Sequence, residues 1–306
     1  MAGSHRVWLF DGGPHGSDRR SLCARPRKPP RRVAPRFRAR GPPDTLTELE
    51  GPVWLLPAFA GFFGLVWGSF LNVVIHRLPL RESLVTPRSR CPSCRRLVAS
   101  YDNIPVVSYI LLRGRCRHCS GSISIRYPGV ELAMAAASLL SFMRHGPSLE
   151  YLVELAFVAA MLALIFIDFD HQILPDSITL SGVVLGLALA WPRETLTFID
   201  ALKGAALGAS VLFLVSEAYF LLKKVEGMGF GDVKMMGMVG AFVAWKGVLL
   251  TLFLGSLTGS VVGIIVIRRS GGDMKTKLPF GTFLGMGAIA TIYAGERVID
   301  WYSGKF

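Results

Sequence analysis

Charged residues are scarce in this sequence. They make up 18% of its 306 residues, whereas an ordinary soluble domain carries about 25%. Hydrophobic residues make up 51%, and the mean hydropathy is +0.45. The apolar residues are gathered in blocks that are too long for the core helices of a soluble protein. This composition excludes an ordinary soluble domain and predicts a polytopic all-α membrane protein.

Acidic residues are the scarcer charge, with 21 of them against 34 basic residues and a net charge of +13. A basic surface could bind the phosphates of a nucleic acid. However, the positive charge is concentrated in an Arg/Pro-rich head and in one loop between apolar segments. The positive-inside rule of membrane proteins produces this distribution. We therefore expect the lipid bilayer, and no nucleic acid, as a partner.

The head, residues 1–50, lacks the apolar segment that closely follows the basic residues of a secretory signal peptide. Its stretch RPRKPPRRVAPRFRARGPP is too poor in apolar residues, and too interrupted by prolines, to offset the entropy of ordering. One interpretation is an anchor for lipid headgroups. We favour a disordered tail, or sequence upstream of a wrongly assigned start near residue 44.

Cysteine is also scarce, with five residues. Four of them form two CxxC pairs, Cys91 with Cys94 and Cys116 with Cys119. Such pairs indicate a metal site in a reducing compartment rather than a disulfide framework. Because 21 residues separate the pairs, the four thiolates could form a tetrahedral Zn²⁺ site. The metal would hold together a loop that is too small to form its own apolar core. His118 is an alternative ligand, but we favour four sulfurs, which leave no open position and make the metal structural.

Eight apolar segments predict a bundle of about eight transmembrane helices. A helix rises by about 1.5 Å per residue, so the first segment, residues 53–75, is long enough to cross the hydrocarbon layer. The other segments are residues 128–143, 151–167, 177–191, 199–222, 237–249, 250–267 and 280–294.

The segments 237–249 and 250–267 are nearly continuous, and the charge of the loops decides that they are separate. The loop of residues 76–127 contains ten arginines and two acidic residues, and basic residues also gather at 223–234 and 268–277. All three loops should be cytoplasmic. Two crossings must therefore separate the last two loops, and both chain ends face outward.

Four aspartates lie at the ends of predicted helices. Asp168 and Asp170 end the third helix, Asp176 follows it, and Asp232 follows the fifth in GMGFGDVK. Ionisable groups in membrane segments are functional candidates. Two neighbouring carboxylates cannot both ionise easily, so one can act as acid and the other as base in peptide hydrolysis. Alternatively, each acid sits at the headgroup boundary beside a partner such as Lys234, but two clusters at the same depth favour catalysis.

The chain around these aspartates is rich in residues that suit a site. Gly227, Gly229 and Gly231 let the backbone pack tightly and let an extended peptide approach. Pro175 breaks the helix that follows the first cluster, as a site-forming loop requires.

Seven motifs together resemble the bacterial prepilin peptidases, also called type IV leader peptidases. The resemblance covers about residues 51–294. The motifs are GSFLNVVIHRLP (68–79), CPSC (91–94), NIPVVSYILLRGRCRHC (103–119), ISIRYPGVEL (123–132), DFDHQILPD (168–176), GMGFGDVK (227–234) and LPFGTFLG (278–285).

This resemblance implies a GxGD-type aspartic protease of the bacterial inner membrane. Its substrates would be type IV prepilins or type II secretion pseudopilins, which lose a short basic leader by cleavage after a glycine. Many members then methylate the new N-terminus with S-adenosylmethionine. The family's catalytic pair maps onto Asp168 and Asp232. The supporting positions would be Asp170, Asp176, Gly229, Gly231 and Lys234.

The resemblance also implies a division of the chain. After the head come the first transmembrane helix (51–75), a cytoplasmic loop domain (76–127) and the peptidase domain (128–306). In this family the cysteine-bearing loop is associated with metal binding and with the methyltransferase half. The loop and the catalytic aspartates would share the cytoplasmic side.

Two other classes of function compete with a protease. Intramembrane carboxylates also serve proton relays in transporters, which often contain internal repeats, but the sequence shows no convincing repeat. A scaffold or assembly factor could use the cysteine loop to bind partners, yet it would not need the aspartates. A protease without methyltransferase activity is a further alternative.

Overall fold

The computed structural model describes residues 54–193, 195–224, 229–269 and 278–304. The chain divides into two units, Met1–Glu50 and Gly51–Phe306, and all the described residues belong to the second. The expectations for residues 1–50 and for Gly227 lie outside the described residues.

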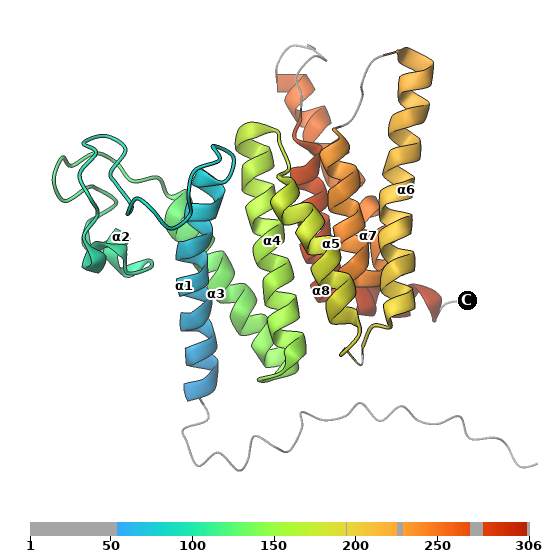
Figure 1. Cartoon of the computed structure of the whole chain (residues 1–306), viewed down its shortest axis with the longest axis horizontal. Coiled ribbons are helices and arrows are strands. Elements are labelled where there is room, and N and C mark those ends of the chain that lie inside the picture. Colours follow the sequence, from blue (N-terminus) through green and yellow to red (C-terminus); the bar gives the residue numbers. More distant parts are fainter. Residues whose placement is uncertain (1–53, 194, 225–228, 270–277, 305–306) are drawn as a thin grey trace, which may run out of the picture. The chain divides into compact units, whose positions relative to one another are not determined.

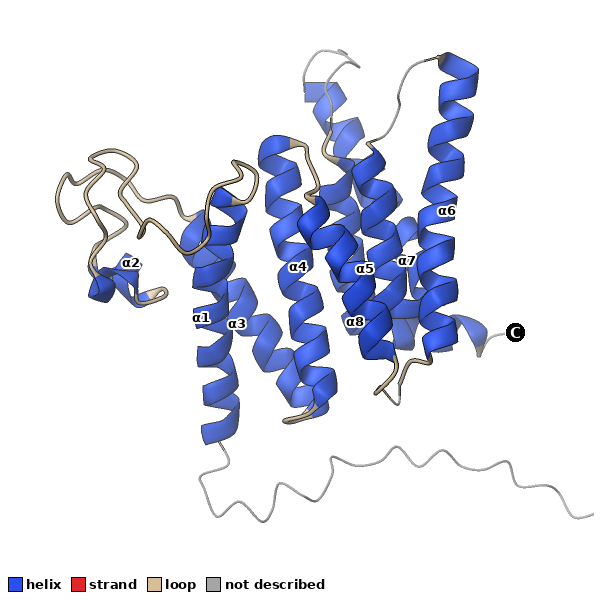
Figure 2. Ribbon diagram, viewed as in Figure 1, coloured by secondary structure: helices blue, strands red, loops and turns tan. Residues whose placement is uncertain are grey.

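The described residues form an all-α bundle and contain no strand (Figures 1 and 2). Four helices, α1, α4, α6 and α7, are long and apolar enough to cross a membrane. These findings confirm the predicted helical membrane bundle. The long helices are α1 (Leu55–Arg77), α3 (Arg126–His145), α4 (Leu149–His171), α5 (Asp176–Ala190), α6 (Phe198–Lys223), α7 (Phe230–Arg269) and α8 (Phe280–Ser303).

Local sequence signals explain where several helices begin and end. Ser148 precedes α4 and accepts a hydrogen bond from the Tyr151 N–H, and Thr197 caps α6 in the same way. Such caps satisfy backbone donors that the first helical turn leaves unpaired. At its other end α4 stops at Gln172, which is left-handed, and Pro175 then precedes α5. The short connection between α4 and α5 therefore places the end of α4 beside the start of α5.

The long helix α7 is a hairpin of two helices. Ala244 has a left-handed φ of 58° and interrupts the helical backbone. Asp232, near the start of α7, lies beside Gly281, and Gly263, far along α7, lies beside Leu278. In a straight helix Asp232 and Gly263 would be about 46 Å apart, so the chain must reverse at Ala244.

This reversal divides α7 into two helices, as predicted for segments 237–249 and 250–267, with two differences in position. The break comes at Ala244 rather than at residues 249–250, at a point where α6 packs against the backbone, since a Cβ at Gly204 would lie 2.8 Å from Cα of Ala244. The first half of α7 begins at Phe230 rather than at residue 237. Asp232 therefore lies in the first helical turn and not in the preceding loop.

Helix α4 is the centre of the bundle and contributes to both large apolar clusters. On one side its Phe157 packs with Met235 of α7 and Leu284 of α8. On the other side its Ile167 packs with Ile75 of α1. Because lipid is as apolar as these side chains, close van der Waals packing stabilises such contacts in a membrane. Residues at the end of α4 are thus held by neighbours on two sides.

The connection between α1 and α3 is mostly loop and contains only two short helices among its described residues (Figure 2). These are η2 (Ser100–Asn103) and α2 (Val107–Leu111). The loop is tied to the bundle where the Val106 N–H donates to the Glu131 carboxylate of α3, at 2.7 Å. The buried Arg77 at the end of α1 donates to the carbonyl oxygens of Ser83 and Pro87. These bonds hold the loop against the ends of α1 and α3.

Candidate active site and metal centre

The structure brings Asp168 and Asp232 together from different helices. Asp168 lies near the end of α4 and Asp232 in the first turn of α7, and they are only 6% and 7% exposed. A Cβ atom at Gly281 would lie 3.0 Å from Oδ2 of Asp168 and 3.0 Å from Oδ1 of Asp232. The two carboxylates therefore converge on one point beside the start of α8.

The two carboxylates differ in their hydrogen bonds. Oδ2 of Asp168 accepts from the backbone N–H of Thr282 at 2.7 Å and from its hydroxyl at 3.1 Å. Oδ1 of Asp232 is buried and has no hydrogen-bond partner among the described residues. A buried polar atom without a partner costs free energy and needs an explanation. The two carboxylates are therefore unequal, because Asp168 has donors from Thr282 and Asp232 has an oxygen without one.

The neighbouring acids Asp170 and Asp176 have a different environment. Asp170 forms an ion pair with Arg126 of α3, and Asp176 forms one with Lys234 of α7 at 2.7 Å. Among the described residues, no ion pair involves Asp168 or Asp232. The alternative of an acid at the headgroup boundary beside a basic partner therefore fits Asp170 and Asp176. Their ion pairs tie α4 to α3 and α5 to α7. The same alternative does not describe the two buried carboxylates.

The glycines near the site have unequal surroundings. A Cβ at Gly231 would lie 2.9 Å from the Leu174 side chain, so the α4–α5 connection packs closely there. A Cβ at Gly229 would meet nothing within 4 Å, so the chain just before the aspartate is open on that side. Gly281 and Thr282 were not among the residues expected at the site. Their only signal in the sequence is the motif LPFGTFLG, which contributes to the family resemblance but implies no role for either residue.

The two CxxC pairs adopt the same backbone turn. In the first, the Cys91 N–H donates to the carbonyl of Arg96, and the Arg95 N–H donates to the Cys91 carbonyl. In the second, Cys116 bonds with Gly121 and Ser120 in the same two ways. Each turn is closed by an isolated β-bridge, and the residue four after the first cysteine has a positive φ in both. Each pair of sulfurs is therefore presented on one side of a tight turn.

The four sulfur atoms fit a single metal ion. All of them, from Cys91, Cys94, Cys116 and Cys119, lie within 4.8 Å of one another, and the Cys91 and Cys119 sulfurs are 3.8 Å apart. With Zn–S bonds of about 2.3 Å, a tetrahedral site places its sulfurs about 3.8 Å apart. His118 is not in this group, and its Nδ1 lies 3.4 Å from an Arg96 nitrogen.

The thiol of Cys91 is also prepared for deprotonation. The backbone N–H of Cys94, and to a smaller extent that of Ser93, lowers the pKa of Cys91 to about 6, although burial opposes the shift. Because metals bind the thiolate, this environment favours a metal ligand. Cys119 differs, because the backbone N–H of Gly121 lowers its pKa but burial and the neighbouring cysteines raise it to about 11. The geometry of the four sulfurs suits a structural Zn²⁺.

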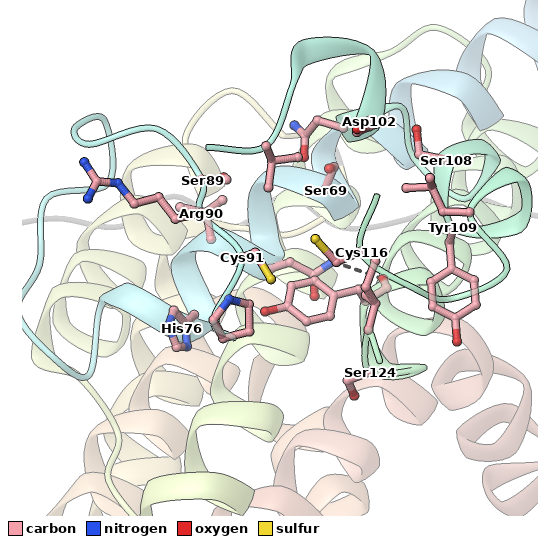
Figure 3. A pocket seen from close by; sticks show the side chains of 18 of the residues that line it. Ser69, His76, Ser89, Arg90, Cys91, Asp102, Ser108, Tyr109, Cys116 and Ser124 are labelled. Atoms are coloured by element: carbon pink, nitrogen blue, oxygen red, sulfur yellow. Dashed lines mark hydrogen bonds between the residues drawn. The ribbon is translucent and has the colours of Figure 1, made fainter. Parts of the chain in front are cut away.

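A cavity of about 990 Å³ adjoins the cysteine turns (Figure 3). Figure 3 shows Cys91, Cys116, Asp102 and Tyr109 around it, together with His76 from α1. Glu131 and the start of α3 complete its lining. The cavity is therefore walled by α1, by the cysteine loop and by α3.

Comparisons with known proteins agree on one family. Residues 62–145 match the bacterial peptidase A24 N-terminal domain, and residues 155–264 match the type IV leader peptidase family. No solved structure matches the chain significantly.

Several curated relatives are similar over most of their length. A "Prepilin leader peptidase/N-methyltransferase" of Myxococcus xanthus is 42% identical over 229 residues, which cover 74% of this chain and 68% of the relative. Proteins of the same name from Pseudomonas putida and Legionella pneumophila are 38% and 33% identical. Those alignments cover 78% and 82% of this chain and 90% and 96% of the relatives. The chain therefore belongs to the type IV leader peptidase family.

Proposed function

We propose that this protein is a membrane aspartic endopeptidase that cuts the basic leader from type IV prepilins or type II secretion pseudopilins after a glycine. The observation that carries the proposal is the convergence of the buried Asp168 and Asp232 carboxylates beside Gly281. The curated relatives named prepilin leader peptidase/N-methyltransferase support the same activity.

The two carboxylates divide the work of peptide hydrolysis. One takes a proton from the attacking water, and the other donates a proton to the carbonyl oxygen of the scissile bond. Two donors from Thr282 favour the ionised form of Asp168, which then acts as the base. Asp232, whose Oδ1 has no donor among the described residues, carries the shared proton and acts as the acid. When the C–N bond breaks, Asp168 gives the proton that it took from water to the leaving amine, and Asp232 takes a proton back from a hydroxyl of the tetrahedral intermediate. Both aspartates thus return to their starting states.

The ion pairs around the site position the catalytic helices. Lys234 lies two residues after Asp232 and pairs with Asp176 at the start of α5. Arg126 pairs with Asp170, two residues after Asp168. Asp170, Asp176 and Lys234 therefore support the site without touching the reacting atoms. Gly229 leaves room for the substrate backbone, and Gly231 lets the Leu174 side chain pack against the start of α7.

The second activity is methylation of the new N-terminus with S-adenosylmethionine. The cavity beside the cysteine loop is of the size that small-molecule sites have, about 300–1,000 Å³. Its lining contains the carboxylates of Glu82, Asp102 and Glu131 and the ring of Tyr109, together with seven arginines. The carboxylates and the ring can attract the sulfonium of the methyl donor, and the arginines can bind the carboxylate of the same molecule. The four cysteines hold a structural Zn²⁺ that keeps the walls of this cavity in place.

The protein acts in the bacterial inner membrane, with the cysteine loop and the catalytic aspartates on the cytoplasmic side. The substrate's basic leader then stays in the cytoplasm, where the positive loops also lie. Its scissile bond reaches the carboxylates at the ends of the membrane helices.

A cleavage assay with purified protein tests this proposal. Wild type, Asp168→Asn and Asp232→Asn are incubated with a model prepilin in detergent, and the products are analysed by mass spectrometry. We expect cleavage after glycine by wild type alone, and the mass of one methyl group on the new N-terminus when S-adenosylmethionine is present. Activity in a folded Asp232→Asn protein would rule out the carboxylate pair. Wild type that leaves several prepilins uncut would favour a transporter or an assembly factor.

A further inference from the structure

The cavity beside the cysteine loop has one buried carboxylate in its wall. Glu131 of α3 is 8% exposed, whereas Glu82 lies in an exposed part of the loop. The third acid of the lining, Asp102, is already paired, because Arg117 donates to both of its oxygens. In the part of the chain that the structure describes, no ion pair involves Glu131, although seven arginines line the same cavity. Among these residues the buried carboxylate therefore has no cationic partner.

Neutral groups hold the Glu131 carboxylate in place on the cavity wall. The Val106 N–H donates to its Oε2 at 2.7 Å, and the Ser69 side chain of α1 interacts with the same carboxylate. A Cβ at Gly68 would lie 2.6 Å from Cα of Glu131, so the backbones of α1 and α3 are in contact here. Buried charges in proteins are usually paired. A fixed carboxylate without a cation is thus suited to bind a cationic group of a ligand.

Glu131 lies at the end of the cavity that is deepest in the helix bundle. Glu131 and Ser69 are the lining residues of α3 and α1 that are furthest from the loop. Ser69 precedes Arg77, the last residue of α1, by eight residues or about 12 Å along the helix axis, and Figure 3 shows Ser69 and the cysteines around the same cavity. Phe70, next to Ser69, is 46% exposed, and an exposed apolar side chain on a membrane helix faces lipid. The cavity therefore extends from the polar loop to a level where α1 borders the bilayer.

The cavity and the two catalytic carboxylates lie at the same end of the bundle. Arg126, at the start of α3, lines the cavity and forms an ion pair with Asp170. Asp170 is two residues after Asp168 on α4. A new N-terminus that is made at the carboxylates is thus already on the side of the membrane where the cavity lies.

We propose that Glu131 binds the new N-terminal ammonium group of the cleaved prepilin and takes its proton when that group is methylated. This inference rests on the proposed function, because the cleavage proposed there leaves an apolar helix whose first residue carries an ammonium group. Such a product reaches the cavity from the bilayer, at the level of Glu131, whereas a water-soluble methyl donor enters from the loop. Asp102 and Tyr109, which belong to the loop, stay available for the donor.

The proton transfer makes the amine reactive. An α-ammonium group has a pKa of about 8 and no lone pair, so it must lose a proton before its nitrogen can attack a methyl carbon. The Glu131 carboxylate accepts that proton as a general base. The nitrogen then forms a bond to the methyl carbon of S-adenosylmethionine, the C–S bond breaks, and its electron pair stays on the sulfur. Glu131 finally releases its proton to water.

Peptide binding tests the amine site in the absence of a methyl donor. The probe is a synthetic peptide with the sequence of a mature prepilin N-terminus, labelled at its C-terminal end and titrated with the full-length protein in nanodiscs. We expect wild type to bind the free-amine peptide about tenfold more tightly than the N-acetylated peptide, and Glu131→Gln to bind the two equally. Glutamine keeps an oxygen that can accept from the Val106 N–H.

Glu217→Gln is the control for the binding experiment, because it removes an exposed carboxylate from α6. It should keep the preference of wild type for the free amine. A wild type that binds both peptides equally would overturn the proposal. A preference that persists in Glu131→Gln would also overturn it, since the amine would then bind elsewhere.

A methylation assay tests the role of Glu131 as a base. We expect Glu131→Gln to methylate a pre-cleaved peptide about 100-fold more slowly than wild type, and Glu131→Asp, which keeps a carboxylate, to recover part of the rate. Zinc content and prepilin cleavage are measured on the same preparations, because a merely structural role would lower them together with methylation. Equal losses of cleavage and methylation would overturn the proposal, as would unimpaired methylation by Glu131→Gln.

The two assays separate this inference from the function on which it rests. A wild type that cuts no prepilin, but whose preference for the free amine is lost in Glu131→Gln, would support the amine site and contradict the peptidase. A wild type that cuts and methylates prepilin, with Glu131→Gln doing both at the same rate, would do the reverse.

Discussion

The absence of a side chain at Gly281 decides how closely the two carboxylates of the candidate site can approach. Asp168 and Asp232 come from different helices, and their nearest oxygens both face this one backbone position. The next residue, Thr282, supplies both donors that hold Asp168. The start of α8 is therefore as much a part of the site as the two aspartates are.

We predict that Gly281→Ala lowers kcat/KM for prepilin cleavage by about tenfold. The added methyl group would lie 3.0 Å from an oxygen of each carboxylate, so the carboxylates must shift by a few tenths of an ångström, and a displacement of about 1 Å at a catalytic group costs about 100-fold. The measurement is steady-state cleavage by the purified variant. Gly259→Ala is the control, because its methyl group would meet the Phe283 ring only at 3.4 Å. Near-wild-type activity of Gly281→Ala would mean that the carboxylates do not react at this position.

At the scale of the helix, α6 is attached to α7 through backbone contacts. A Cβ at Gly204 would overlap the carbonyl oxygen of Gly240, and a Cβ at Gly240 would overlap that of Gly204. One turn further, a Cβ at Gly208 would overlap the carbonyl of Met236. Gly204 and Gly208 have the spacing of a GxxxG motif, by which membrane helices pack closely.

We predict that Gly204→Leu destabilises the bundle, because α6 must move away from α7 to fit the side chain. Overpacking of this kind costs about 1–3 kcal/mol or more, which corresponds to a fall in Tm of several degrees. Thermal unfolding in detergent measures it. Gly61→Leu on α1 is the control, since a Cβ there meets nothing within 4 Å. An equal Tm for the two variants would contradict the close α6–α7 contact.

We expect the cysteine loop to depend on a bound metal in place of an apolar core. Its two turns have the same hydrogen bonds, and the four sulfurs gather at one point between them. We predict about one Zn²⁺ per chain in wild type and far less in Cys94→Ser, as measured by elemental analysis. Removing the metal should also open the loop between α1 and α3 to limited proteolysis. Cys23→Ser, which changes the fifth cysteine, should behave as wild type, and a full zinc content in Cys94→Ser would exclude the four-sulfur site.

For the whole molecule, ion pairs and contacts define two ends of the bundle. At one end lie the pairs of Asp170 with Arg126 and of Asp176 with Lys234. At the other end Arg193, after α5, pairs with Glu150 at the start of α4 and contacts the carbonyl of Phe242 near the break in α7. The cysteine loop enters α3 at the end that holds the carboxylates.

We predict that reporters fused after Lys224 and after Gly146 lie on opposite sides of the membrane. Lys224 follows α6 and Gly146 follows α3, and these positions belong to opposite ends of the bundle. Alkaline phosphatase should be inactive after Lys224, on the cytoplasmic side, and active after Gly146. Green fluorescent protein fusions should give the reverse pattern. Two active phosphatase fusions would contradict the alternation of helices on which the proposed orientation rests.

The sequence alone determined the class of the protein and most of its helices. Runs of apolar residues have lengths that can be counted, so six of the eight predicted segments begin within two residues of an observed helix start, the two halves of α7 being the exceptions. The spacing of the four cysteines is equally local, and their sulfurs do gather. The motifs also led to the family that the comparisons identified.

Only the tertiary structure decided how these parts meet. The apolar stretch around Ala244 is nearly continuous, so its sequence did not place the break at this residue, where Gly204 of α6 packs against the backbone. The roles of Gly281 and Thr282 depend on residues that are far apart in the chain. Sequence patterns report the preferences of a segment for lipid, water or a metal, whereas contacts between segments depend on the shapes of all the helices at once.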